Sequence, residues 1–308
     1  MTIARTALLL LLLAACAGHT TQPLHLAPLT PHPPALLATD SLERLVAQGL
    51  VTVVDIRTEV QVYLRDHLPG AVYLNPETLR AADHGVPNLL LPAESYRVLF
   101  SRLGVGFDRP VVIYSAGESR NIDATYLAWI LQGFGHPAVY VLDGGYGKWQ
   151  TENRPLTRRY PLVAATEFPD RRFVPERATL KDVQASLGRP GVVLVDARPP
   201  DQYAGDAGAQ MRRGHIPGAV NHYWQDDLER NDFAKVWRDR ERLRAEYAAQ
   251  GITPDKDIIA YCNGGLESSH VYFTLRFLLG YPHVRVYDGS WTEWAERVEL
   301  PIATGERP

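Results

Sequence analysis

Short apolar runs alternate along the chain with longer segments whose apolar residues recur at helical spacing. In the C-terminal half, the apolar runs lie at 191–195, 258–261 and 284–287, and helical spacing is found at 239–250 and 268–279. Continuous apolar strands separated by helices are typical of a parallel sheet that helices cover on both faces. The pattern therefore predicts an α/β fold.

The same pattern occurs twice. Four pairs of segments match in order and with similar separation: VVDIR (53–57) with LVDAR (194–198), DHLPGAV (66–72) with GHIPGAV (214–220), VVIYS (111–115) with IIAYC (258–262), and VYVLDGGYGKW (139–149) with VRVYDGSWTEW (284–294). A repeat of this length indicates a duplicated domain and not a solenoid unit. We expect two tandem copies of one α/β domain, with small insertions between the matching segments.

The N-terminal segment has the features of a targeting signal. Arg5 precedes an apolar run at 7–15, which is too short to span a bilayer and which ends in Leu-Ala-Ala before Cys16. This resembles a bacterial lipoprotein signal, in which cleavage before the cysteine leaves Cys16 as a lipidated N-terminus. An ordinary secretory signal is the alternative. The resemblance implies export to the periplasmic side and a lipid anchor, and Ala17 after the cysteine implies the outer membrane.

Composition then sets the remaining boundaries. After the signal at 1–16, residues 17–38 are rich in Pro, Thr, His and Leu without a period and are expected to form a tether. The first domain is expected at 39–153 and the second at 178–305. The Pro- and Arg-containing segment 154–177 is expected to link them.

Charge and cysteine content exclude several classes of protein. The chain has 308 residues, 45% hydrophobic and 22% charged, which suits two globular domains. A formal net charge of −3 gives no reason to expect nucleic acid as a partner. The two cysteines form at most one disulfide, and lipidation of Cys16 would leave Cys262 as a free thiol. One cysteine and scattered histidines also lack the spacing of a zinc site, so no metal is expected.

Cys262 lies where chemistry is expected in such a fold. It ends an apolar strand, and two glycines lead from it into a helix beginning near Glu267 or Ser268. Ligands of open α/β sheets bind beyond the carboxyl ends of the strands. Inward-pointing loop N–H groups and the helix N-terminus should lower the pKa of the Cys262 thiol and favour nucleophilic catalysis. A buried cysteine that only packs is the alternative.

With these segments in view, the chain resembles a tandem rhodanese, a thiosulfate or 3-mercaptopyruvate sulfurtransferase. The resemblance is carried by Asp-Ala-Arg at 196–198, GHIPGAVN at 214–221, the YCNGG loop at 261–265 and VYDGSWTEW at 286–294. It implies that catalytic Cys262 takes a sulfane sulfur from a small anionic donor and passes it from a persulfide to cyanide or a thiol, without a cofactor. The residues implied to cradle the persulfide are Asn263, Gly264, Gly265, Leu266 and Glu267.

The resemblance assigns roles to residues outside the loop. Asp196 and Arg198 are implied to brace the site, with Arg198 also near the substrate, and a plain buried ion pair is the alternative. Trp291 is expected to line the pocket or to pack in the core. The first copy has Ser115 where the second has Cys262, and a serine without a base cannot form a persulfide. The first domain is therefore expected to be non-catalytic.

The loop departs from the pattern expected for thiosulfate. Glu267 brings negative charge towards a dianionic donor, whereas thiosulfate-using relatives often carry basic residues in this loop. Arg213, or its neighbour Arg212, is a candidate to supply positive charge, or else a solvated surface residue. The donor stays open between thiosulfate and 3-mercaptopyruvate.

Two other functions are alternatives to a sulfurtransferase. A persulfide carrier would hold its sulfur for a partner with little turnover on small donors. A phosphatase of the cysteine-loop type would need a longer loop ending in an arginine, but Ser268 and Ser269 follow Glu267 and no arginine occurs before Arg276.

Overall fold

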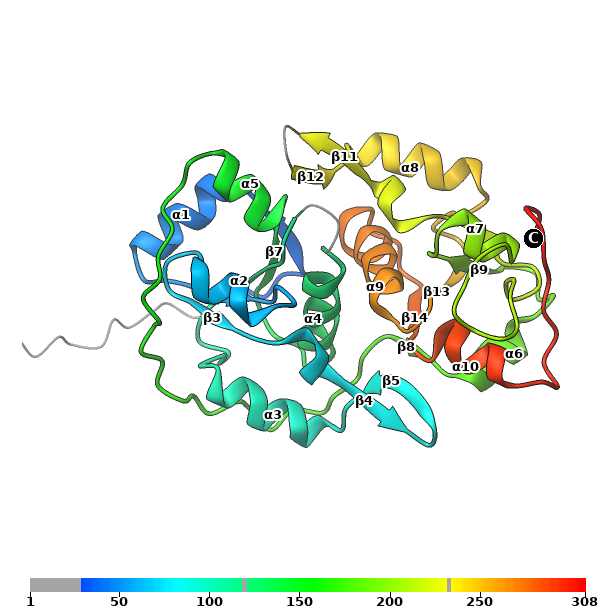
Figure 1. Cartoon of the computed structure of the whole chain (residues 1–308), viewed down its shortest axis with the longest axis horizontal. Coiled ribbons are helices and arrows are strands. Elements are labelled where there is room, and N and C mark those ends of the chain that lie inside the picture. The colour runs from blue at the N-terminus through cyan, green and yellow to red at the C-terminus, as the bar shows by residue number, and fades with distance from the viewer. Residues whose placement is uncertain (1–28, 118–120, 232–233) are drawn as a thin grey trace, which may run out of the picture.

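The computed structural model describes residues 29–117, 121–231 and 234–308, and it contains two α/β domains side by side (Figure 1). Each domain is built on a five-stranded sheet in which all paired strands are parallel. The predicted fold class is confirmed. The expected signal segment with Cys16 and the tether up to residue 28 lie outside the described residues.

The first domain has the strand order β1-β7-β6-β2-β3. Its sheet strands are β1 (Ala35–Leu37), β2 (Thr52–Asp55), β3 (Ala71–Tyr73), β6 (Val111–Tyr114) and β7 (Val139–Leu142). Its helices are α1 (Thr39–Ala47), α2 (Val60–Arg65), α3 (Ala93–Arg102), α4 (Ile122–Gly133) and α5 (Gly145–Thr151), with a 3-10 turn at Pro76–Leu79. A separate antiparallel hairpin consists of β4 (Arg80–Asp83) and β5 (Val86–Leu90).

The second domain repeats this order as β10-β9-β13-β14-β8, read from the opposite edge. Its sheet strands are β8 (Arg177–Ala178), β9 (Val192–Asp196), β10 (Val220–Asn221), β13 (Asp257–Tyr261) and β14 (Val284–Tyr287). Its helices are α6 (Leu180–Ser186), α7 (Pro200–Ala204), α8 (Arg240–Ala249), α9 (Leu266–Phe273) and α10 (Ser290–Glu296), with a 3-10 turn at Trp224–Asp227. Its hairpin consists of β11 (Leu228–Asn231) and β12 (Ala234–Trp237).

The helix that follows Cys262 differs in detail from the prediction at 268–279. It starts earlier, at Leu266, and after Phe273 it continues as a wider π-helical turn over Thr274–Leu278. The Thr274 hydroxyl donates to Asp227 at 2.7 Å and accepts from the indole N–H of Trp237 at 3.0 Å. These buried contacts hold the wide turn in place, and a sequence period does not reveal them.

One of the buried apolar clusters extends across both domains. A single buried cluster contains residues of both, including Ile113 and Trp129 from the first and Val195 and Tyr272 from the second. Helices α4 and α9 face each other between the two sheets (Figure 1). The resulting interface is made of the same kind of buried apolar surface as the interior of each domain.

Each domain also extends its hairpin onto the other. The β4–β5 hairpin reaches α10, and the β11–β12 hairpin reaches α5 (Figure 1). At the matching ends of the two hairpins, the N–H of Leu90 donates to Asp288 at 3.3 Å, and the N–H of Trp237 donates to Asp143 at 3.1 Å. The duplication thus produces a reciprocal exchange of hairpins, one of which covers the side of the molecule that carries Cys262.

Candidate active site

Cys262 is fully buried and follows β13, the central strand of the second sheet. The N–H of Gly265 donates to its sulfur at 3.1 Å, and the Ser268 hydroxyl lies 3.5 Å from it. Gly265 has a φ of 92°, and a Cβ there would lie 3.3 Å from the ring of Tyr126. Only glycine allows the loop to curl around the sulfur beneath the first domain.

The expected lowering of the Cys262 pKa is wrong. Burial and, to a smaller extent, the negative charge of Glu267 raise the pKa of the Cys262 thiol to about 12, although the hydrogen bonds from Ser268 act in the opposite direction. The thiol has no solvent-exposed surface and few of the expected N–H donors reach it. Desolvation therefore outweighs the loop and the helix N-terminus, and the thiol is neutral before a donor binds.

Ser290 supports the sulfur from the start of α10, and sequence reasoning missed it. Its hydroxyl accepts a hydrogen bond from the N–H of Cys262 at 3.1 Å, donates to the carbonyl of Tyr287 at 2.7 Å and lies 3.9 Å from the Cys262 sulfur. Its φ is 54°, in the left-handed region. The internal repeat could have indicated the unusual backbone of Ser290, because the matching residue of the first copy is Gly145, which has a φ of 53°.

Asp196 and Arg198 form a buried pair next to the loop. Both carboxylate oxygens of Asp196 accept from Arg198, whose guanidinium also donates to the carbonyl of Gly214 at 2.7 Å. The guanidinium carbon lies 4.7 Å from the centre of the Trp291 ring. With these contacts and only 1% exposure, Arg198 is placed to brace the site and not to meet a donor directly.

The first domain repeats this brace beside a serine in place of the cysteine. Arg57 bonds both oxygens of Asp55 and donates to the carbonyl of Asp66, and it lies over the ring of Tyr146. Ser115, at the position of the cysteine, lies 3.3 Å from the side chain of Asn121. Because the arginine–aspartate pair occurs beside a serine as well, its contacts belong to the fold of the domain.

Trp291 is a buried packing residue that also holds the loop. Its side chain is 1% exposed, and its backbone N–H donates to the carbonyl of Cys262 at 2.9 Å. The structure thus places Trp291 under the brace and against the cysteine, in agreement with the packing alternative weighed from the sequence.

The other loop residues form the more open side of the site. Asn263, Leu266 and Glu267 are half-buried, whereas Gly264 is buried. The Asn263 amide donates to Gln202 at 2.9 Å, which ties the loop to α7. These half-buried side chains are the part of the loop that a donor can reach.

One residue of the first domain approaches the loop. A Cβ on Gly264 would lie 3.5 Å from the Cβ and the amide nitrogen of Asn88, on strand β5. Asn88 has a φ of 65°, which asparagine adopts more readily than most residues. The exchanged hairpin therefore forms part of the wall of the site.

The two arginines weighed as charge donors have different surroundings. Arg212 donates to the carbonyls of Arg297 and Leu300, both at 2.7 Å, and so fastens the C-terminal segment. Arg213 is exposed. Arg213 therefore stays a candidate for the approach of an anion, but it is not part of the buried site.

Two buried histidines, His270 of α9 and His222, lie beside Asp227. His270 stacks on Trp237, with ring centres 4.6 Å apart, and lies 3.5 Å from Asp227, which also pairs with His222 at 3.0 Å. Burial lowers the pKa of His270 to about 4, so its ring is neutral at neutral pH. Within the described part of the chain, no three His, Cys, Asp or Glu side chains group as metal ligands.

The comparison with known families matches both halves of the chain. The rhodanese-like domain matches residues 38–152 and again residues 179–297. The chain belongs to the rhodanese family. Both domains described above are thus rhodanese domains, and Cys262 stands in the second of them.

Similar rhodanese sequences cover almost the whole chain. The "Sulfur carrier protein TtuD" of Thermus thermophilus is 37% identical over 89% of this chain and 98% of that protein. The "Putative thiosulfate sulfurtransferase SseA" of Mycobacterium tuberculosis is 36% identical over 90% and 93%, and the "Thiosulfate sulfurtransferase" of Corynebacterium glutamicum is 31% identical over 89% and 92%. This rhodanese is a sulfurtransferase.

The solved wild-type structure of EanB has the same fold. It matches with a TM-score of 0.76 and 24% identity, over 88% of this chain and 69% of that chain. At this identity the likeness supports the architecture of the tandem rhodanese domains and nothing finer.

Proposed function

We propose that this rhodanese moves a sulfane sulfur from thiosulfate or 3-mercaptopyruvate, through a persulfide on Cys262, to cyanide or a thiol. The observation that carries the proposal is the Cys262 sulfur held by the Gly265 N–H and the Ser268 hydroxyl at the end of the central strand. Such donors stabilise negative charge on sulfur, and a terminal persulfide anion would extend towards the half-buried side of the loop.

The reaction divides into two displacements. The Cys262 thiol gives its proton to water, and the thiolate attacks the outer sulfur of thiosulfate, so that a new S–S bond forms and the old S–S bond breaks with release of sulfite. With 3-mercaptopyruvate, the C–S bond breaks instead, and the leaving enolate takes up a proton to become pyruvate. The carbon of cyanide then attacks the outer sulfur of the persulfide, which forms thiocyanate and returns the cysteine as a thiolate. A thiol acceptor would take the sulfur in the same way.

The charges around the sulfur favour the less charged donor. Glu267 lies close enough to raise the pKa of the Cys262 thiol, after the larger effect of burial, and Arg198 is already engaged by Asp196. Thiosulfate carries two negative charges and 3-mercaptopyruvate carries one. We therefore propose that 3-mercaptopyruvate has the lower KM of the two.

Thiocyanate formation from each donor tests the proposal. The protein starting at Ala17 is suitable, because it keeps every helix and strand found among the described residues, the first of which begins at Ala35. Cys262→Ser should abolish the reaction with both donors, whereas Ser115→Ala, at the matching position of the first domain, should leave it intact. Activity that survives in Cys262→Ser would overturn the assignment of the nucleophile.

A carrier function is a second candidate. It is favoured by the full burial of a neutral Cys262 thiol and by the relative named as a sulfur carrier protein. In that case, the protein would form a persulfide once per chain but would release thiocyanate slowly with either donor. Comparison of the single-turnover amount with the steady-state rate separates the carrier from the enzyme.

We further propose that the protein is exported and held at the periplasmic face of the outer membrane by a lipid on Cys16. The apolar run and the Leu-Ala-Ala-Cys ending of the sequence support this proposal. No helix in the described residues is long and apolar enough to cross a membrane. Metabolic labelling with a fatty acid, compared between the parent and Cys16→Ser, tests the site of the anchor.

A further inference from the structure

The inter-domain linker carries an unusual exposed segment, with the sequence PLTRRYPLVAA at 155–165. It contains two arginines and no acidic residue, and its large apolar side chains are at least one-third exposed: Leu156, Tyr160, Leu162 and Val163. Single exposed apolar side chains are normal on protein surfaces. A contiguous exposed apolar surface, in contrast, marks a site of contact with another molecule or a membrane.

The segment is fixed on the surface of the first domain. Thr157 and His67 exchange two backbone hydrogen bonds of 2.9 Å, and the carbonyl of Arg159 contacts the His67 ring at 3.1 Å. The ring of Tyr160 stacks at 6.0 Å on that of Tyr63 in α2. The exposure of this segment is therefore built into the fold.

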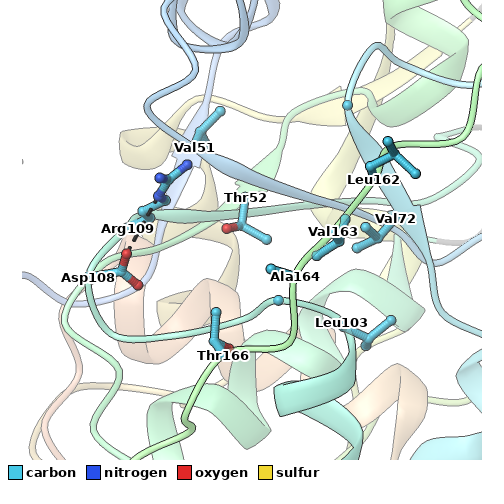
Figure 2. A pocket seen from close by; sticks show the side chains of 12 residues that line it. Val51, Thr52, Val72, Leu103, Asp108, Arg109, Leu162, Val163, Ala164 and Thr166 are labelled. Carbon is cyan, nitrogen blue, oxygen red and sulfur yellow. Dashed lines mark ion pairs between the residues drawn. The ribbon is translucent and has the colours of Figure 1, made fainter. Parts of the chain in front are cut away.

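The apolar side chains stay exposed although a cavity lies beside them. The linker residues Leu162, Val163 and Thr166 line one side of a cavity of about 310 Å3, and Val72 and Leu103 line other parts of its wall (Figure 2). Leu162 is nevertheless fully exposed, and Val163 is 41% exposed. The side chains of Leu162 and Val163 therefore present apolar surface to solvent.

Neighbouring apolar and basic side chains extend the surface onto α2. Val60 and Leu64 are 38% and 46% exposed, and Arg65 is also exposed, with its guanidinium 3.6 Å from the carboxylate of Asp66. Arg158 donates to the carbonyl of Arg65 at 2.8 Å, which places the linker and the end of the helix side by side. The surface combines apolar side chains, a tyrosine at their margin and a group of arginines.

We propose that this surface, formed by residues 155–165 and the exposed side of α2, rests on a phospholipid membrane with anionic headgroups. Apolar side chains can enter the interfacial region, tyrosine prefers that depth, and arginines pair with the phosphates. The surface belongs to the first domain, so Cys262 in the second domain stays free for its donor and acceptor. The proposal does not depend on the donor or on lipidation of Cys16.

Vesicle sedimentation tests the proposal with the protein starting at Ala17, which lacks the lipidation site. Vesicles of phosphatidylglycerol with phosphatidylcholine should retain the protein, and vesicles of phosphatidylcholine alone should retain much less. Leu162→Ser should weaken binding about tenfold, since one buried leucine is lost from the membrane contact. Arg159→Gln should weaken it about fivefold and should reduce its dependence on salt.

Two matched variants control for apolar exposure in general. Met211→Ser and Val298→Ser remove exposed apolar side chains of the second domain, at 96% and 81% exposure, and should leave vesicle binding unchanged. The proposal is overturned if the parent does not bind anionic vesicles, if Leu162→Ser binds as the parent does, or if Met211→Ser loses as much as Leu162→Ser. Thiocyanate formation in solution should be unchanged in all of these variants, which separates the membrane surface from the active site.

Discussion

The cysteine loop is held at the scale of single residues by side chains that the sequence motif does not single out. Ser290 adopts a left-handed conformation that costs a non-glycine residue about 1 kcal/mol, and its hydroxyl accepts the N–H of the buried Cys262. The first copy has Gly145 at this position and Ser115 in place of the cysteine. The strained serine is therefore found only in the copy that has a sulfur to position.

Substitution of Ser290 separates strain from hydrogen bonding. Ser290→Ala keeps the unfavourable φ and leaves the N–H of Cys262 without its partner, so unfolding should become easier by about 2 kcal/mol. Ser290→Gly loses the same hydrogen bond but relieves the backbone strain, so its free energy of unfolding should fall by about 1 kcal/mol less than that of Ser290→Ala. Denaturant unfolding of the two variants measures the difference, and equal losses would show that the strain is absent.

Glu267 tunes the sulfur through its charge. Glu267→Gln should lower the pKa of the Cys262 thiol, because a negative charge that disfavours the thiolate is removed while burial stays. The thiolate absorbance should then appear at lower pH, and the KM for thiosulfate should fall. Glu296→Gln, an exposed glutamate of α10, is the matched control and should change neither. If the titration of Cys262 is unchanged in Glu267→Gln, the charge of Glu267 does not influence the choice of donor.

Among the secondary-structure elements, the two exchanged hairpins are each held by an aspartate, and the two aspartates have different surroundings. Asp288 accepts from Leu90 and pairs with Arg177 at 2.7 Å. Asp143 accepts from Trp237, and burial raises its pKa to about 6, against the effect of that hydrogen bond. The carboxylate of Asp143 is therefore a destabilising charge at neutral pH.

Asp143→Asn should stabilise the protein in a pH-dependent way. The folded-state pKa is raised, so the stability contributed by the neutral carboxyl is complete below pH 3.8 and is lost as the pH rises through about 6. Asparagine stays neutral and still accepts from Trp237. The gain over the parent should be about 3 kcal/mol at pH 8, about half of that at pH 5 and small at pH 4. Thermal unfolding at pH 4 and pH 8 checks this, and a gain that is equal at the two values contradicts it.

The elements themselves could largely be predicted from the sequence. Predicted strands at 191–195, 258–261 and 284–287 agree with β9, β13 and β14 within one residue, because continuous apolar runs of this length fit few other structures. The π-helical turn after Phe273 could not be predicted, since Asp227 and Trp237 hold it from distant parts of the chain. The predicted lowering of the Cys262 pKa was wrong for a similar reason, because the burial of the thiol depends on the packing of both domains.

At the scale of the whole molecule, the two domains behave as one packed unit. One apolar cluster runs through both, and the Thr125 and Ser269 hydroxyls meet across the interface at 3.0 Å. The sequence repeat predicted the duplication, but not this interface, because no period records which helices face each other. The copy that lacks the cysteine thus supplies one wall of the loop that carries Cys262.

The shared core predicts a single unfolding transition. Scanning calorimetry should give one peak whose van't Hoff and calorimetric enthalpies agree, because neither domain can unfold without exposing the apolar surface of α4 and α9. Two resolved transitions would mean that the interface is weak and that each domain is stable alone.

Intact-protein mass spectrometry after exposure to thiosulfate or 3-mercaptopyruvate tests directly whether Cys262 carries the transferred sulfur. The parent and Ser115→Ala should gain the mass of one sulfur atom, Cys262→Ser should not, and cyanide should remove the gain. The added sulfur should map to the peptide that contains Cys262. A parent that gains no sulfur from either donor, or a Cys262→Ser variant that gains it, would contradict the proposed persulfide and the role of Cys262.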